Sequence, residues 1–394
     1  MLRGQGIVCF AKEWGEDPTS NNHVMRLLAR DNTVLWLNSI GTRRPSLGRS
    51  EDLAKIRRKL RTLGRGTQEV APGLHVFTPL VLPLPASRLA AVANLAVLRT
   101  TLAALRRRLG IGRFQLWSFL PTAAPYVGKL GEDLSIYYCV DEWSQFRSVH
   151  GARIARQEED LLRKVDVVFA TSQALLERKR PFNPETHLLS HGVDHEHFSA
   201  ALRPETPLAR ELVGVKRPII GFFGLLEDWI DVELLAHVAR SRADWTVCVI
   251  GRALVDVSPL RSLGNVLLLG RRPYAELPSY CRGFDVGLCP FRVNELTMHV
   301  NPIKLREYLA AGLPVVSTDL PECRLHPQWT RVGCDPEDFV AQIESALRQD
   351  SPEARRLRSE AMKAESWDRK IEQLGMVVNR RLQQRRRNLP DTPP

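Results

Sequence analysis

The stretch VGLCPFRVNELTMHVNPIKLREYLAAGLPVVSTDLPE, residues 286–322, decides the fold of this chain. Its apolar beginning, VGLCPF, predicts a buried strand, and Asn301 followed by Pro302 predicts an N-cap and the first position of a helix. Gly312 and Pro314 end that helix, and PVVST resumes the sheet. A strand, a helix and a strand in this order indicate a parallel sheet, with the helix beginning at its carboxyl edge, where open α/β sheets bind ligands.

Two charged residues lie on one face of the predicted helix. Lys304 falls in the first turn, where free N–H groups and a partial positive charge attract phosphate. Glu307 is one turn deeper and could accept hydrogen bonds from both hydroxyls of a ribose. The alternative is an ordinary Lys–Glu pair on a solvated helix, which contributes only about 0.2–0.5 kcal/mol.

Short apolar runs alternate with helical patterns along the rest of the chain. In the first half the predicted buried strands cover residues 6–10, 33–39, 74–79, 114–119, 134–140, 165–172 and 186–193. The second half repeats the pattern in RPIIGFFG, WTVCVIG, NVLLLG, VGLCPF and PVVSTD. This alternation predicts two consecutive doubly wound α/β domains. Their junction is expected within residues 197–218, where the strand pattern lapses and prolines collect.

The composition excludes several classes of protein. The chain has 394 residues, enough for two domains, and 44% of them are hydrophobic. Charged residues appear by Lys12, before a signal-like core could form, and we find no uncharged apolar run of about 18 residues, so we expect a cytoplasmic protein. Seven cysteines without a C-x-x-C pair predict buried reduced thiols rather than a metal site.

The formal net charge of +12 calls for an anionic partner: nucleic acid, lipid or a phosphorylated substrate. Residues 87–109 form an apolar helix that ends in arginines, as expected of a surface that meets anionic lipid, although a core helix with a charged end is the alternative. The basic residues gather in three groups: Arg43, Arg44, Arg49, Lys55, Arg57, Arg58, Lys59, Arg61 and Arg65; Arg106, Arg107, Arg108 and Arg113; Arg380, Arg381, Arg385, Arg386 and Arg387.

NPIKLREYLAAGLPVVSTDLPE resembles the signature of the GT-B glycosyltransferases, in which the glutamate that opens E-x-L-A-x-G-x-P-V-V binds the ribose of the donor. Glu307 matches that glutamate. The landmarks VDVVFATSQALLERK, HGVDHEHF, RPIIGFFG and VIGR agree with the family in order and spacing, and ESWDRK, residues 365–370, looks like the start of its C-terminal helix. The likeness covers nearly the whole chain and is closest to bacterial enzymes of cell-wall and exopolysaccharide synthesis, including teichuronic-acid-type transferases and the xanthan glucuronosyltransferase.

The resemblance implies two Rossmann-like domains that face each other across a cleft. We expect an acceptor-binding domain at residues 1–197, a nucleotide-sugar-binding domain at 198–364, a helix crossing back at 365–388 and a disordered tail at 389–394. It implies transfer of a sugar from a UDP or GDP donor to a saccharide or lipid-linked acceptor, on the inner face of the plasma membrane. The family needs neither a cofactor nor a metal, and the sequence has no Asp-x-Asp metal motif.

On the donor side the expected residues are Glu307, Lys304, Asn301, Gly224 and Arg252. The chain departs from the family in two ways. His299 stands where many retaining members carry a first glutamate, eight residues before the ribose glutamate, and GFFGLLEDWIDVELL lacks the usual arginine and lysine of the phosphate loop. We therefore expect the diphosphate to depend on Lys304, on the helix N-terminus and on Arg252.

On the acceptor side a carboxylate is expected to take the proton of the attacking hydroxyl. Asp141 and Glu142 follow the predicted strand LSIYYCV, and the xanthan-type enzyme has an aspartate base after a comparable strand, so Asp141 is the predicted base. The alternative is that Asp141 caps the next helix. Glu142 is a weaker candidate, as are Asp17, Asn22 and His23 near the start of the first helix, and capping is the more ordinary role for Asn22.

Two other functions are compatible with some of these features. A nucleotide-sugar epimerase would use the same fold, and analysis of products with and without an acceptor separates it from a transferase. A basic nucleic-acid-binding protein would explain the charge, but neither an RNP run nor a helix-turn-helix pattern is visible in the sequence. Steeply salt-dependent binding to random DNA would favour that second function.

Overall fold

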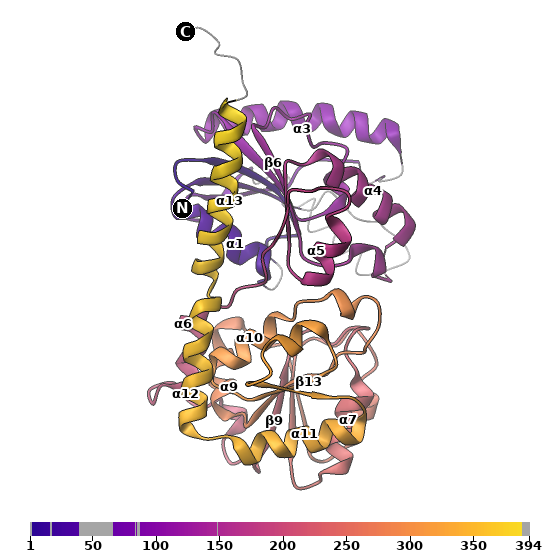
Figure 1. Cartoon of the computed structure of the whole chain (residues 1–394), viewed down its shortest axis with the longest axis vertical. Helices are drawn as coiled ribbons and strands as arrows, with labels where there is room; N and C mark the ends of the chain where they lie inside the picture. Colours follow the sequence, from indigo (N-terminus) through magenta and orange to yellow (C-terminus); the bar gives the residue numbers. More distant parts are fainter. Residues whose placement is uncertain are drawn as a thin grey trace. The chain divides into compact units, whose positions relative to one another are not determined.

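The computed structural model describes residues 2–15, 18–38, 66–82, 84, 87–147 and 149–387 (Figure 1). The chain divides into two compact units, Met1–Ser190 with Ile371–Pro394, and His191–Lys370. The division precedes residue 197, the predicted end of the first domain, because Val193 is already tied to the second unit: its N–H donates to the Glu365 carbonyl at 3.0 Å. The predicted tail at 389–394 lies outside the described residues.

The first unit is built on an eight-stranded sheet in the order β3-β4-β2-β1-β5-β6-β7-β8. Neighbouring strands are parallel except for the antiparallel pair β3 and β4. Every strand predicted in this half is present, but β3 is exposed and polar and lacked the apolar run that identified the others. The strands are β1 (Gly6–Phe10), β2 (Thr33–Leu37), β3 (Gln68–Ala71), β4 (Leu74–Phe77), β5 (Phe114–Ser118), β6 (Leu134–Cys139), β7 (Val167–Ala170) and β8 (Thr186–Leu188).

Helices of the first unit begin where side chains cap their free N–H groups. Ser87 accepts from the Ala90 N–H at the start of α3, and Ser172 accepts from the Leu175 N–H at the start of α5. Between β6 and β7 the amphipathic α4 buries Leu161 and Leu162 in the core of this unit. The helices are α1 (Ser20–Ala29), α3 (Arg88–Arg108), α4 (Gly151–Lys164), α5 (Gln173–Lys179) and the greater part of α13 (Trp367–Arg387).

The second unit is a six-stranded, wholly parallel sheet in the order β11-β10-β9-β12-β13-β14. Strand order reverses between β9 and β12, and such a switch point is where doubly wound sheets bind ligands at their carboxyl edge. Strand β14 was not predicted, because a single valine gives TRVG no apolar run. The strands are β9 (Ile219–Phe223), β10 (Thr246–Ile250), β11 (Val266–Gly270), β12 (Val286–Cys289), β13 (Val315–Thr318) and β14 (Thr330–Gly333).

Helices form two layers on this second sheet (Figure 1): α6, α9, α10 and α12 pack together, and α7 packs with α8 and α11. The α/β fold of two doubly wound units is confirmed. The prediction of buried thiols is also confirmed, since six of the seven cysteines are buried and Cys334 is exposed. The helices are α6 (His195–Ser199), α7 (Val232–Ser241), α8 (Ser258–Arg261), α9 (Leu277–Gly283), α10 (Ile303–Ala310), α11 (Pro336–Gln349) and α12 (Pro352–Ala361).

Helix α10 is held close against the switch point. The Tyr308 hydroxyl accepts a hydrogen bond from the Phe223 N–H at 2.9 Å, which ties α10 to the last residue of β9. Gly287 in β12 leaves room for this packing, because a Cβ there would lie 2.6 Å from the Tyr308 ring. The packing fixes the start of α10 beside the ends of β9 and β12.

Candidate donor site and acceptor-side carboxylates

Lys304 lies at the carboxyl end of β9 in a mostly aromatic setting. Its ammonium sits over the rings of Phe222 and Phe291, 5.6 and 5.1 Å from their centroids. A Cβ at Gly224 would lie 2.9 Å from the Lys304 Cε, and Gly224 has a φ of 141°, so this position requires glycine. Burial lowers the pKa of Lys304, although nearby groups, including Glu307, act in the opposite direction.

Glu307 is buried one turn further along α10, with 6% of its surface exposed. Burial raises the pKa of Glu307 to about 7, while the positive charge of Lys304 lowers it in part and the charge of Asp194 adds to the rise. The interpretation of Lys304 and Glu307 as a solvated surface pair is therefore wrong. Within the described part of the chain, neither side chain has a hydrogen bond or an ion pair to protein.

Asn301 does not cap α10 as predicted. The residue at the N-cap is Pro302, whose backbone is extended, and the helix begins at Ile303. The Asn301 side chain is instead engaged in the interior: its Nδ2 donates to Glu322 Oε2 at 2.6 Å, and its Oδ1 accepts from Arg306 Nη1 at 2.6 Å. Asn301 thus anchors the loop that leads into α10.

Gly224 and Arg252 lie in two loops that are joined by backbone hydrogen bonds at the ends of β9 and β10. The Gly224 N–H donates to the Ile250 carbonyl at 2.9 Å, and the Leu226 N–H donates to the Arg252 carbonyl at 3.0 Å. Gly251 lets the two loops touch, because a Cβ there would collide with the Gly224 carbonyl oxygen. The structure therefore brings Gly224, Lys304 and the backbone of Arg252 to one edge of the second sheet, and the Arg252 side chain is exposed there.

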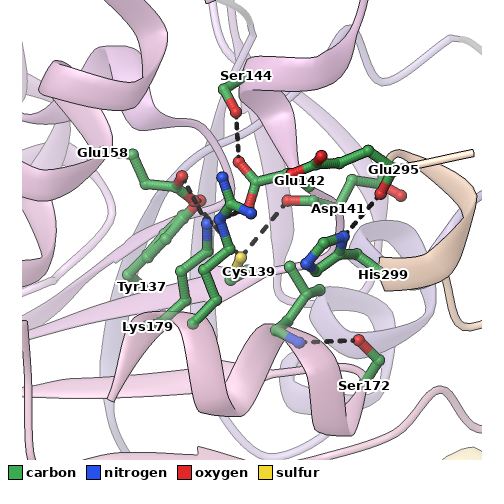
Figure 2. Close-up of polar contacts among 12 residues, drawn as sticks. Tyr137, Cys139, Asp141, Glu142, Ser144, Glu158, Ser172, Lys179, Glu295 and His299 are labelled. Carbon is green, nitrogen blue, oxygen red and sulfur yellow. Dashed lines mark hydrogen bonds and ion pairs between the residues drawn. The ribbon is translucent and has the colours of Figure 1, made fainter. Parts of the chain in front are cut away.

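His299 lies in a short 3₁₀ helix, Thr297–His299, that follows β12. Its Nδ1 is 2.7 Å from the Glu295 carbonyl oxygen, as Figure 2 shows. An imidazole therefore stands at the sequence position where the family resemblance led us to look for a carboxylate.

In the first unit, Asp141 follows β6 and its side chain does not cap a helix. The next helical turn, Trp143–Gln145, has Glu142 at its N-cap and no side-chain cap, so the capping alternative for Asp141 is wrong. Burial, followed by the negative charge of Glu142, raises the pKa of Asp141 to about 7. A carboxyl group that titrates near neutrality suits general base catalysis.

Glu142 belongs to a buried network next to Asp141 (Figure 2). Lys179 Nζ donates to Glu142 Oε2 at 2.6 Å and to Glu158 Oε2 at 2.8 Å. Ser144 also donates to Glu142 at 2.6 Å, and the Tyr137 hydroxyl donates to Glu158 at 2.6 Å. Burial alone would raise the pKa of Glu142, but Lys179 and its hydrogen bonds hold that pKa below the ordinary value. Glu142 is therefore an ionised structural partner rather than a free base.

The structure describes two of the three weaker acceptor-side candidates near the start of α1. Asn22 accepts from the Thr19 N–H at 3.0 Å, which confirms its capping role at the start of α1. His23 lies in the first turn of the same helix and is partly buried. Asp17 lies outside the described residues. The described ranges contain no group of three or more His, Cys, Asp or Glu side chains able to hold a metal ion.

The sequence alone did not identify several residues of these two sites. Phe222 and Phe291 were predicted only as strand residues, and the partners of Asn301 and Glu142 are distant in sequence: Glu322 is 21 residues from Asn301, and Lys179 is 37 residues from Glu142. The runs FFG and CPF end at the carboxyl edge of predicted strands, which is the one signal that could have placed the two aromatic rings near the site.

Comparison with known proteins finds a matching family model and a named relative. Residues 217–349 match the family model described as glycosyl transferases group 1. Over 274 residues the chain is 27% identical to TuaH of Bacillus subtilis (strain 168), which is described as a putative glycosyltransferase of teichuronic acid biosynthesis. The match covers 64% of this chain and 68% of that protein.

Two solved structures show the same fold. Sucrose-phosphate synthase of Thermosynechococcus elongatus superposes with a TM-score of 0.68 at 14% identity, covering 95% of this chain and 98% of the other. Anabaena Alr3699/HepE in complex with UDP and glucose gives a TM-score of 0.67 at 14% identity, covering 95% and 99%.

The fold and the sequence matches point to one class, the glycosyltransferases of the GT-B fold. More particularly, the match to group 1 glycosyl transferases lies within the second unit.

Proposed function

We propose that this glycosyltransferase moves a sugar from a nucleoside diphosphate sugar, bound at the switch point of the second unit, to a hydroxyl of a saccharide or lipid-linked acceptor. One observation carries the donor assignment: Glu307 is buried and Lys304 is partly buried on one face of α10, and neither side chain has a hydrogen bond or an ion pair to protein among the described residues. Buried charged groups are normally paired, so an unpaired cation and carboxyl at a sheet edge suit a ligand that supplies the partners.

The two groups fit the two polar parts of such a donor. The Lys304 ammonium would bind the diphosphate, whose negative charge grows as the sugar leaves, and Glu307 would accept hydrogen bonds from the ribose hydroxyls. The start of α10 adds free N–H groups beside the phosphates, and Gly224 allows the donor to approach the backbone closely. Arg252 and Asn301 contribute at the same edge, the first through its exposed side chain and the second by holding the loop before α10.

Asp141 would act on the acceptor. As the acceptor oxygen bonds to the anomeric carbon, the bond from that carbon to the diphosphate oxygen breaks, and the hydroxyl proton passes to the Asp141 carboxylate. A pKa of about 7 leaves a substantial fraction of Asp141 ionised at neutral pH. Neither a cofactor nor a metal enters this step.

The relatives support the choice of donor and pathway. HepE was solved in complex with UDP and glucose, and a trehalose-6-phosphate structure from E. coli was solved with UDP-2-fluoro glucose bound, so UDP is the first nucleotide to test and GDP the second. The TuaH match supports a role in bacterial polysaccharide or glycolipid synthesis. Such an enzyme would work in the cytoplasm at the inner face of the plasma membrane, where lipid-linked acceptors are presented.

The test is a thermal-shift screen against UDP, GDP and their sugars, followed by product analysis with and without an acceptor. We expect one nucleotide family to raise the melting temperature of the wild type and to lose this effect in Glu307→Ala. Glu353→Ala, at an exposed glutamate of α12, is the matched control and should respond as the wild type does. Sugar isomerisation without an acceptor would instead identify an epimerase, and a full nucleotide response in Glu307→Ala would overturn the donor site.

A further inference from the structure

Helix α3 in the first unit has an apolar face that the core does not cover. Its buried positions recur every fourth residue, at Ala90, Asn94, Leu98 and Leu102. Away from that stripe, Leu89 is 84% exposed, Val92 67% and Val97 40%. A helix on the surface of a soluble domain normally turns polar residues outward, so these side chains require another explanation.

The loop before α3 adds further exposed apolar side chains. Asn94 holds this loop to the helix: the Leu82 N–H donates to Asn94 Oδ1 at 2.7 Å, and Asn94 Nδ2 donates to the Leu82 carbonyl at 3.1 Å. Of the 17 large apolar side chains exposed among the described residues, six lie within residues 80–97. They form the surface called here the α3 surface: Leu80, Leu82, Leu84, Leu89, Val92 and Val97.

Along the sequence, the segment that contains the α3 surface carries charge of one sign. From Val70 to Gly131 the chain contains seven Lys and Arg residues and no Asp or Glu. At the C-terminal end of α3, Arg107 and Arg108 are exposed, whereas Arg106 lies over the Phe114 ring at 4.1 Å. Asp133, the acidic residue near this end of α3, is bonded to Arg113 at 2.7 Å. Exposed apolar side chains on the same helix as exposed arginines fit a surface that is both apolar and anionic, which describes a lipid headgroup region.

The packing of α3 indicates whether the helix would span a membrane or lie on its surface. By length and composition, Leu89–Arg108 is the one helix in the described ranges that could cross a bilayer. Only 22% of its most apolar 18-residue stretch is buried. Leu98 and Leu102, however, belong to the core of the first unit. Since one stripe of the helix is packed into the domain, the opposite side can lie in the interface plane while the helix stays on the domain.

We infer that the α3 surface docks the protein on an anionic lipid membrane, with α3 lying flat in the headgroup region. The purpose of this docking rests on the proposed function, because it would bring the enzyme to a lipid-linked acceptor. The docking itself depends only on the apolar and basic residues of the first unit, so it can fail or hold independently of sugar transfer.

Vesicle co-sedimentation tests this inference with the full chain, using phosphatidylcholine alone and phosphatidylcholine with phosphatidylglycerol. We expect binding only to the anionic vesicles, weakened by salt. We expect it to be at least about tenfold weaker in Leu89→Gln/Val92→Gln and in Arg107→Gln/Arg108→Gln. Leu357→Gln on α12 and Arg348→Gln on α11 are matched controls at exposed positions of the second unit, and should bind as the wild type does.

Melting temperature and donor binding should be unchanged in all of these variants, which separates docking from the proposed function. Equal binding of the wild type to both kinds of vesicle, no binding to either, or unchanged binding of Leu89→Gln/Val92→Gln would each overturn the inference. Sedimentation velocity adds one further outcome: a wild-type dimer that becomes monomeric in Leu89→Gln/Val92→Gln, without vesicle binding, would show that a second copy covers the α3 surface and would also overturn it.

Discussion

Lys304 and Glu307 differ from an ordinary helical ion pair in how much of their environment is apolar. The ammonium of Lys304 faces the rings of Phe222 and Phe291, and burial raises the pKa of Glu307 to about 7. The sequence predicted the identity and spacing of this pair, together with its place at the start of a helix. It did not predict the burial, because the aromatic residues reach the site from the ends of β9 and β12.

Lys304→Ala should raise the KM for the donor and lower kcat, because the lost ammonium stabilises the departing diphosphate more strongly than the bound substrate. Steady-state kinetics over a range of donor concentrations measures both effects. Lys363→Ala, at an exposed lysine of the same unit, is the control. Kinetics equal to those of the wild type would remove Lys304 from the donor site.

Glu307 should also make the stability of the folded protein depend on pH. Its pKa is raised in the folded protein, so the stabilisation that protonation provides is complete below about 4.5 and is lost as the pH rises through about 7. Glu307→Gln mimics the protonated form. The melting temperature of Glu307→Gln minus that of the wild type should therefore increase from pH 5 to pH 8 without nucleotide. A constant difference across this range would contradict the buried, partner-free carboxyl.

Asp141 predicts the pH profile of catalysis. A general base must be ionised, so kcat/KM should rise with pH through about 7. The charge of Glu142 contributes to the raised pKa of Asp141, and Glu142→Gln should therefore move the midpoint of the profile to lower pH. A profile that stays flat from pH 5 to pH 9, or a midpoint unmoved by Glu142→Gln, would argue that Asp141 is not the titrating base.

At the scale of elements, the start of α10 depends on a buried polar network. Asn301 bonds to Glu322 and to Arg306, and Arg306 Nε lies 3.4 Å from Glu365 Oε2. Lys370 joins the same carboxylate at 2.8 Å, so the network runs from the donor-side loop to the first turn of α13. Apolar runs predicted the strands and helices of this region. The network could not be predicted, because its pairs are formed by the fold and not by local sequence.

Asn301→Ala should destabilise the second unit by about 1–3 kcal/mol, because it leaves one hydrogen-bonding group on Glu322 and one on Arg306 without the partner that Asn301 supplied. Urea unfolding measures this loss. Donor affinity should fall as well, since the loop before α10 loses its anchor. Asn265→Ala, which removes a partly buried asparagine elsewhere in the unit, should cost stability while leaving donor affinity unchanged. Equal donor affinity in both variants would limit Asn301 to a structural role.

At the scale of the molecule, the proposed function divides the chemistry between the two units. The alternation of short apolar runs and helices was enough to predict two doubly wound units, and the E-x-L-A-x-G-x-P-V-V likeness was enough to place Glu307. The polar edge strand β3 and the partners of Glu142 required the structure, since neither leaves a periodic signal in the sequence. Donor binding is therefore expected to depend on the second unit, and proton transfer on the first.

Calorimetric titration of the donor nucleotide into the wild type, Glu307→Ala and Asp141→Asn, combined with initial rates on the same preparations, tests this division most directly. Asp141→Asn should bind the nucleotide as the wild type does and turn over about 10²-fold more slowly or worse, because only the base is lost. Glu307→Ala should lose nucleotide affinity while keeping its fold. Wild-type affinity in Glu307→Ala, or a rate within about twofold of the wild type in Asp141→Asn, would contradict this division between the units.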